Sequence, residues 1–339
     1  MLDRTLATGK PAGKGGKTFV DFFMNKYIRA FLHKLVLFCK TGRWTDSIWN
    51  DSIGQYYTGN KAIYWESIPG VAKYQFELIT GDENQDYFSY IIEKLKALNK
   101  SGMTGLSIGC CEANSTELAF WETGLFSHFD IMDIADDLLA KQQQKADNEH
   151  FSYLRVDLNS VSLPENHYDL ITAVGTIHHI KDLDNLFLNI NRALKDGGIF
   201  FCREYVGPNS LQFSRRQMEI ANGMLQCLPA SHRITPAGGI KQKARKPNIY
   251  KLKIVDPSEA INSENIEKAF KNHLQVIQYT PTGGTLLSPL LNQIAFNFDK
   301  DETGRRLLNT MIKLEKELMK CGDIGSDYMF AVGGKKINH

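Results

Sequence analysis

The stretch Leu106-Ser-Ile-Gly109-Cys-Cys-Glu-Ala-Asn114-Ser-Thr-Glu117-Leu-Ala-Phe120 predicts a strand, a turn and a helix in direct succession. Its apolar start is typical of a buried strand, and Gly109 permits a tight turn. Asn114 is suited to be the N-cap of the helix, with Glu117 three residues later as its capping-box partner. A chain that passes from a parallel strand into a helix presents free backbone NH groups to a polar or anionic ligand. We therefore predict a cofactor-binding turn at Gly109.

An acidic residue follows this turn at the spacing of a nucleotide-binding unit. Asp133 ends a second apolar run, 129–133, and lies 24 positions after Gly109, where roughly 20 residues are typical of an acid that binds a ribose. A dinucleotide fingerprint G-x-G-x-x-G that starts at Gly109 would need glycine where the chain has Cys111 and Asn114. The pattern therefore disfavours NAD and hydride transfer.

Apolar strands and helices alternate beyond this unit. The chain predicts strands over 151–157, 168–176 and 199–206, with a helix over 183–194 between the last two. The run 168–176 is nearly continuous in apolar and β-branched residues, as a strand covered on both faces should be. Such alternation is typical of a doubly wound parallel sheet.

This succession resembles the class I S-adenosylmethionine-dependent methyltransferases, of the methyltransferase type 11 kind. In that resemblance Asp133 matches the acid that holds the ribose hydroxyls, and Asp157 matches the acid that accepts from the adenine amino group. The run Pro164-Glu-Asn-His-Tyr-Asp-Leu-Ile-Thr-Ala173 resembles the family's fourth-strand motif, and His178-His179-Ile180 resembles the histidine step that follows it. The resemblance covers roughly residues 100 to 206.

The turn itself departs from the family's first motif, an apolar pair and an acid followed by G-x-G-x-G. Ser107 replaces the acid, and Cys111 and Ala113 replace the later glycines. The resemblance nevertheless implies S-adenosylmethionine as the cofactor. The cofactor-binding residues that it implies are Ser107, Gly109, Cys110, Cys111, Asn114, Asp133, Ile134, Asp157, Leu158 and Gly175.

The family's architecture is an α/β fold, a doubly wound Rossmann-like seven-stranded sheet with a final antiparallel hairpin, here preceded by an N-terminal helical cap. Strands over 273–279 and 328–332, with a long helix over 305–319, would form this closing hairpin. The expected divisions are a basic tail over 1–17, an amphipathic helix and helical cap over 18–100, and the methyltransferase domain over 101–339, with a basic loop at about 238–256.

Methyl transfer to a hydroxyl needs a base for the acceptor's proton, and histidine suits that task near neutral pH. His178 and His179 follow the fourth strand, at the edge where doubly wound sheets bind ligands. Glu204 and Tyr205 end the fifth strand and are also expected to face this crevice. For each histidine the alternative is that it only shapes its turn. For Glu204 and Tyr205 the alternative is that they cap the turn at 207–208.

The sequence lacks the usual signatures of other acceptor classes and of a catalytic metal ion. The chain has no N-P-P-Y-like tetrapeptide for an amino group and no Pro-Cys pair for a pyrimidine carbon. It has neither H-E-x-x-H nor clustered carboxylates in sequence, so no metal site is expected. We predict O-methylation of a small-molecule, sugar or lipid-linked acceptor. The alternatives are a non-catalytic protein that keeps the fold to bind a partner, and an RNA methyltransferase recruited through its basic segments.

Composition narrows the setting. The 339 residues include 40 Lys and Arg against 38 Asp and Glu, a net charge of +2 that gives no reason to expect nucleic acid. None of the six cysteines forms a C-x-x-C pair, which predicts reduced thiols in a cytoplasmic protein. No signal peptide or apolar run of 18 residues is visible, so we expect no membrane span.

The segment 18–40 predicts an amphipathic helix. Its apolar residues at helical spacing are Val20, Phe23, Tyr27, Ile28, Phe31, Leu32, Leu35 and Phe38. Together with the cations of the preceding tail, this pattern fits a helix that touches an anionic membrane from the cytoplasmic side. The alternative is a helix that packs on its own domain or on a second copy of the chain in a homodimer.

Overall fold

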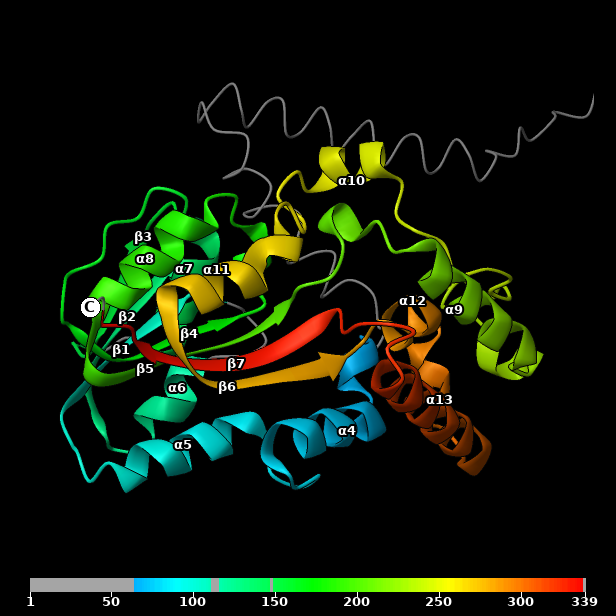
Figure 1. Cartoon of the computed structure of the whole chain (residues 1–339), viewed down its shortest axis with the longest axis horizontal. Coiled ribbons are helices and arrows are strands. Elements are labelled where there is room, and N and C mark those ends of the chain that lie inside the picture. The colour runs from blue at the N-terminus through cyan, green and yellow to red at the C-terminus, as the bar shows by residue number, and fades with distance from the viewer. Residues whose placement is uncertain (1–63, 111–115, 147–148, 338–339) are drawn as a thin grey trace, which may run out of the picture.

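The computed structural model describes residues 64–110, 116–146 and 149–337, and Figure 1 shows how their elements are arranged. Several predicted features lie outside these described residues. They are the basic tail 1–17, the amphipathic helix 18–40, most of the helical cap, and the cofactor-turn residues Cys111 and Asn114.

Seven strands form one sheet in the order β3-β2-β1-β4-β5-β7-β6. Their bounds are β1 Met103–Ile108, β2 Phe126–Asp133, β3 Phe151–Arg155, β4 Tyr168–Val174, β5 Leu194–Tyr205, β6 Leu274–Gly283 and β7 Tyr328–Lys335. The first five strands are parallel, while β7 pairs antiparallel with both β5 and β6. The predicted doubly wound sheet with a closing antiparallel hairpin is confirmed.

Helices cover both faces of this sheet. In Figure 1, α4 Pro69–Thr80 and α5 Tyr87–Ala97 lie below it, with α6 Thr116–Trp121, while α8 Leu183–Ala193 and α11 Ile266–His273 lie above it. A further helix, α7 Asp136–Lys145, contacts β2 and β3. The described part of the predicted cap therefore forms part of one covering layer.

The alternation of side chains along β5 builds the core on both sides. Phe200 packs against Phe187 and Phe270 on one face, and Phe201 packs against Phe120 on the other. All three contacts join fully buried rings. Each buried phenylalanine contributes about 1.5–3 kcal/mol relative to an exposed one, so these pairs fix the position of the strand that ends at the site.

A third group of helices lies at one end of the sheet, to the right in Figure 1. It consists of α9 Arg215–Cys227, α12 Leu287–Leu291 and α13 Glu302–Lys320. Glu315 of α13 is fully buried, and its carboxylate accepts from the backbone NH groups of Gly284, Leu286 and Leu287. This carboxylate satisfies NH groups at the start of α12 that would otherwise be buried without partners.

Some boundaries differ from those predicted. The third strand ends at Arg155, so Asp157 lies in the turn beyond it. Helix α9 begins at Arg215, because Ser214 and Gln217 form a capping box there and Ser210 before it has a positive φ. The predicted basic loop contains a short helix, α10 Ile249–Val255, that Asn248 caps.

Short 3-10 turns complete the described elements. They are η1 Trp65–Ser67, η2 Ile177–His179, η3 Asn209–Leu211, η4 Ala230–Arg233, η5 Ser263–Asn265 and η6 Ala295–Asn297. Across the described ranges, none of the helices combines the length and the apolar character that crossing a bilayer requires.

Candidate active site

The glycine turn after β1 touches the chain that leaves β4. Gly109 has φ +80°, and a Cβ built on it would lie only 2.1 Å from Oγ1 of Thr176. Its NH group donates to the carbonyl of Met132 at 2.7 Å. Only glycine therefore suits this position, both for its backbone angle and for its contact with the residues after β4.

Asp133, at the end of β2, closes the turn through both oxygens of its carboxylate. Its Oδ2 accepts from the NH of Cys110 at 2.8 Å, and its Oδ1 accepts from the NH of Ala135 at 2.8 Å. Burial raises the pKa of this carboxyl against the lowering effect of those NH groups. Since each carboxylate oxygen can accept more than one hydrogen bond, Asp133 can hold the turn and still receive a hydroxyl.

The other predicted cofactor residues take more varied positions. Ser107 is buried, and its Oγ lies 3.5 Å from the carbonyl oxygen of Gly109. Leu158 belongs to the core. Asp157 is exposed to solvent in the turn after β3. Its carboxylate accepts from the backbone NH of Asn159. Gly175 is exposed at the end of β4.

Two more residues of that set complete the turn. Cys110 is buried beside Asp133. Ile134 follows Asp133, is partly buried and accepts from Nε of Arg155 through its carbonyl. The structure thus gathers Gly109, Cys110 and Asp133 closely.

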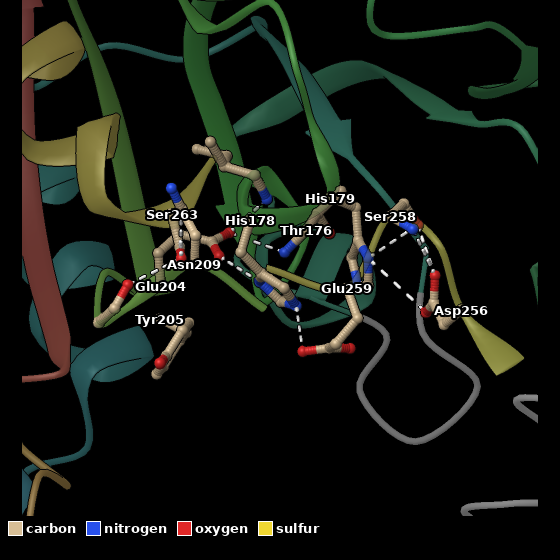
Figure 2. A network of polar contacts seen from close by, with 12 residues as sticks. Thr176, His178, His179, Glu204, Tyr205, Asn209, Asp256, Ser258, Glu259 and Ser263 are labelled. Atoms are coloured by element: carbon tan, nitrogen blue, oxygen red, sulfur yellow. Dashed lines mark hydrogen bonds and ion pairs between the residues drawn. The ribbon is translucent and has the colours of Figure 1, made fainter. Parts of the chain in front are cut away.

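Glu204 positions the histidine turn η2 (Figure 2). Its Oε1 accepts from the NH groups of Thr176 and Ile177 at 2.7 and 2.8 Å, and its Oε2 accepts from Nδ1 of His178 at 2.9 Å. The Glu204 side chain is fully buried. All of these contacts lie within the turn after β4, so Glu204 orients His178 and does not cap the turn at 207–208.

Tyr205 has the structural role that the sequence left as its alternative. Its hydroxyl donates to the carbonyl of Pro208 at 3.0 Å, and its ring packs edge-on against Tyr328. Burial raises the pKa of this hydroxyl. Tyr205 therefore caps the turn at 207–208.

His179 is oriented by residues from a distant segment. Its Nδ1 lies 3.2 Å from Oγ of Ser258 and 3.9 Å from Oδ2 of Asp256. Oγ of Ser258 in turn donates to Oδ1 of Asp256 at 2.7 Å. The two histidine rings lie side by side, with centroids 4.1 Å apart.

The pKa values of the two histidines are shifted in opposite directions. Burial alone would lower the pKa of His178, but the hydrogen bond and charge of Glu204 raise it to about 9. Burial and the neighbouring charge of His178 lower the pKa of His179 well below its usual value. The carboxylate of Glu204 and the proximity of the two rings therefore shift the two pKa values in opposite directions.

Glu259 completes this cluster, although nothing in the sequence around it predicted this position. Its Oε1 lies 4.0 Å from Nε2 of His178, on the side of the ring away from Glu204 (Figure 2). Burial raises the pKa of the Glu259 carboxyl. The only local signal was that Asp256 and Glu259 end the basic stretch, which says nothing about histidines some 80 positions earlier.

The central part of the chain is similar to known proteins. Residues 106–202 match the model of the methyltransferase domain. The ubiquinone/menaquinone biosynthesis C-methyltransferase UbiE of Shewanella baltica is 29% identical over 82 residues, which are 23% of this chain and 33% of that protein. The chain thus spans about a third of the length of the curated relatives it matches.

Solved structures are also similar. An S-adenosylmethionine dependent methyltransferase from Mesorhizobium loti is 14% identical with a TM-score of 0.39, and the match covers 71% of this chain and 95% of that one. Phosphoethanolamine N-methyltransferase 2 from Haemonchus contortus, in complex with S-adenosyl-L-methionine, is 17% identical with a TM-score of 0.42, covering 84% and 60%.

Proposed function

We propose that this chain, whose residues 106–202 belong to the class I S-adenosylmethionine-dependent methyltransferases, transfers the methyl group to an oxygen of a small-molecule, sugar or lipid-linked acceptor. One contact carries the proposal. The turn at Gly109 meets Thr176, two positions before His178, so the expected cofactor site and the histidine cluster are neighbours. A methyl donor at the turn and an acceptor at the histidines would therefore lie next to each other.

The cofactor side rests on the turn and Asp133. The carboxylate of Asp133 lies at the carboxyl end of β2, where ligands of doubly wound sheets bind, and would receive the ribose hydroxyls. Its NH donors hold both oxygens in place before any ligand arrives, so little ordering is needed on binding. Ser107, in place of the family's acid, adds no charge there.

The acceptor side rests on His178. Transfer to a hydroxyl requires that the O–H proton leaves, so a group facing that oxygen must either take the proton or stabilise the anion that forms. Glu204 fixes the ring of His178 through Nδ1 and leaves Nε2 on the side of Glu259. Holding donor and acceptor in line supplies up to roughly 7–11 kcal/mol of the barrier reduction.

Calorimetric titration with S-adenosylhomocysteine tests the cofactor half. We expect micromolar affinity for the full chain. Asp133→Ala should lose affinity by about 1.5–3 kcal/mol, because two ribose hydroxyls and two backbone NH groups lose a charged partner. Asp157→Ala, which changes the exposed carboxylate expected near the adenine, should cost less. A folded protein that gives no heat would instead favour a non-catalytic partner protein.

A screen with labelled S-adenosylmethionine against hydroxylated sugars, lipids and phenols tests the acceptor half. Product analysis by NMR then locates the new methyl group. The curated relatives are C-methyltransferases by name, and a phenol that loses its proton also becomes nucleophilic at the neighbouring ring carbon. If the new methyl groups are found only on carbon, the function is C-methylation and not O-methylation. RNA labelling that weakens steeply with salt would instead favour an RNA methyltransferase.

A further inference from the structure

Three potential metal ligands converge after β4. One ring nitrogen of His178, one of His179 and a carboxylate oxygen of Glu259 all lie within 4.8 Å of one another. The histidines come from η2, and Glu259 comes from the segment before η5 (Figure 2). The three side chains are partly buried.

Oxygen partners behind both rings support the same arrangement. Glu204 binds Nδ1 of His178, and Ser258 and Asp256 lie beside Nδ1 of His179. Metal-binding histidines usually have such a partner on the nitrogen that does not bind the metal, because it fixes the tautomer and raises ligand basicity. With Nδ1 engaged in each ring, Nε2 is the nitrogen suited to face an ion. Nε2 of His178 is also the atom nearest to Glu259.

We propose that His178, His179 and Glu259 form a binding site for a divalent transition-metal ion such as Zn²⁺. Two imidazoles and one carboxylate suit this class of ion, whereas Mg²⁺ and Ca²⁺ prefer oxygen ligands alone. Bonds of 2.0–2.2 Å place tetrahedral ligands about 3.4 Å apart. The cluster must therefore contract slightly, and rotation of the partly exposed Glu259 side chain provides that movement.

Three protein ligands leave a coordination position open, as in catalytic zinc sites. The next step rests on the proposed methyl transfer. In it, an oxygen of the acceptor fills the open position and its O–H proton passes to water. The oxygen then forms a bond to the methyl carbon while the S–C bond breaks, and its electron pair stays on sulfur as a neutral thioether. The acceptor class is thus one whose hydroxyl oxygen can coordinate a metal ion.

Titration of the chelator-treated full chain with Zn²⁺ and, separately, Co²⁺ tests the site by calorimetry and visible absorption. We expect the wild type to bind one equivalent of either ion. Glu259→Gln should weaken this binding at least 10-fold. Glu204→Gln should weaken it 10- to 100-fold, since its amide disturbs the histidine that it orients. Glu165→Gln, which changes an exposed glutamate elsewhere, is the matched control and should bind as the wild type does.

A second measurement on the wild type locates the ion without any variant. Diethylpyrocarbonate modifies accessible histidines, and peptide mass mapping should show that Zn²⁺ protects His178 and His179 but not the exposed His167. Equal binding by the wild type and Glu259→Gln, or no protection of the two histidines, overturns the metal site.

The two proposals fail separately. A chain that binds S-adenosylhomocysteine but shows no Glu259-dependent ion keeps the proposed function and loses the metal site. A chain that binds the ion at this cluster but gives no heat with S-adenosylhomocysteine keeps the metal site and loses the proposed function. If His178 acts as a base without metal, Glu259→Gln retains methyl transfer and chelators leave it unchanged.

Discussion

Gly109 is the residue at which the two halves of the candidate site meet. Gly109→Ala should destabilise the protein in two ways: the left-handed backbone costs an alanine about 1–2 kcal/mol, and the clash with Thr176 adds about 1–3 kcal/mol of overpacking. Urea unfolding measures the sum, and calorimetry with S-adenosylhomocysteine should show that the variant no longer binds.

Gly124→Ala separates these two effects. Gly124 also has a positive φ, +70°, but a Cβ there would meet no atom within 4 Å. Gly124→Ala should therefore lose only the unfolding free energy that the left-handed backbone costs, and it should bind S-adenosylhomocysteine normally. If both variants lose the same stability and both bind, the contact between Gly109 and Thr176 does not constrain the site.

Asp327, just before β7, links three elements beside the sheet. Its Oδ2 accepts from Gln217 of α9 at 2.7 Å, and its NH donates to Thr285, two residues before α12. Burial raises the pKa of its carboxyl to about 6, above the ordinary value of 3.8, although Gln217 and Thr285 lower it. The folded state thus holds this proton more tightly than the unfolded state between about pH 4 and pH 6.

Stability from this group is therefore present at low pH and lost as the pH rises through about 6. Relative to Asp327→Asn, the wild type should lose about 2 kcal/mol of unfolding free energy between pH 4.5 and pH 7.5. Asn keeps an oxygen for Gln217, so the variant should fold. Urea unfolding at both values, with exposed Asp196→Asn as control, measures the difference. Parallel pH profiles would contradict the assignment.

The parallel core was predictable because its signals are local. Short apolar runs that alternate with helical segments predicted β1 to β5 in the right order, and the acid at the end of β2 contacts the glycine turn. Ends of elements were less predictable. The third strand stops before Asp157, and α10 interrupts the basic stretch that was expected to be a loop.

The histidine cluster was predictable only in part, for a physical reason. His178 and His179 are adjacent in sequence, and their place after β4 follows from the sheet. Glu259 reaches them from a segment that the chain brings back between α10 and α11, and no local periodicity encodes that return. A search for clustered carboxylates in sequence therefore could not find a site whose ligands are some 80 positions apart.

For the whole molecule, the segment 18–40 leaves two hypotheses. One is packing on its own domain or on a second copy, which is the more common role of such a helix, and the other is contact with an anionic membrane surface together with the basic tail. Each cation near the surface adds about 1 kcal/mol of attraction. If the segment contacts a membrane, the full chain should co-sediment with anionic liposomes at low salt and be released at high salt, whereas a chain that begins at residue 41 should not sediment. Neutral liposomes are the control.

The opposite outcome supports the packing alternative. If the full chain ignores anionic liposomes at low salt, the membrane hypothesis fails. Loss of stability in the truncated chain would then place the segment against its own domain. A change from dimer to monomer on truncation, seen by analytical ultracentrifugation, would place it against a second copy.

The position of β7 has a consequence for protein synthesis. β7 lies between β5 and β6, so β6, although made earlier, has no partner in the described sheet until Tyr328–Lys335 has left the ribosome. Until then β5, the strand that ends at Glu204 and Tyr205, presents an unpaired apolar edge that can pair with other chains. A chain released after residue 327 would keep that edge open, and the cell's chaperones and proteases should treat it as unfinished.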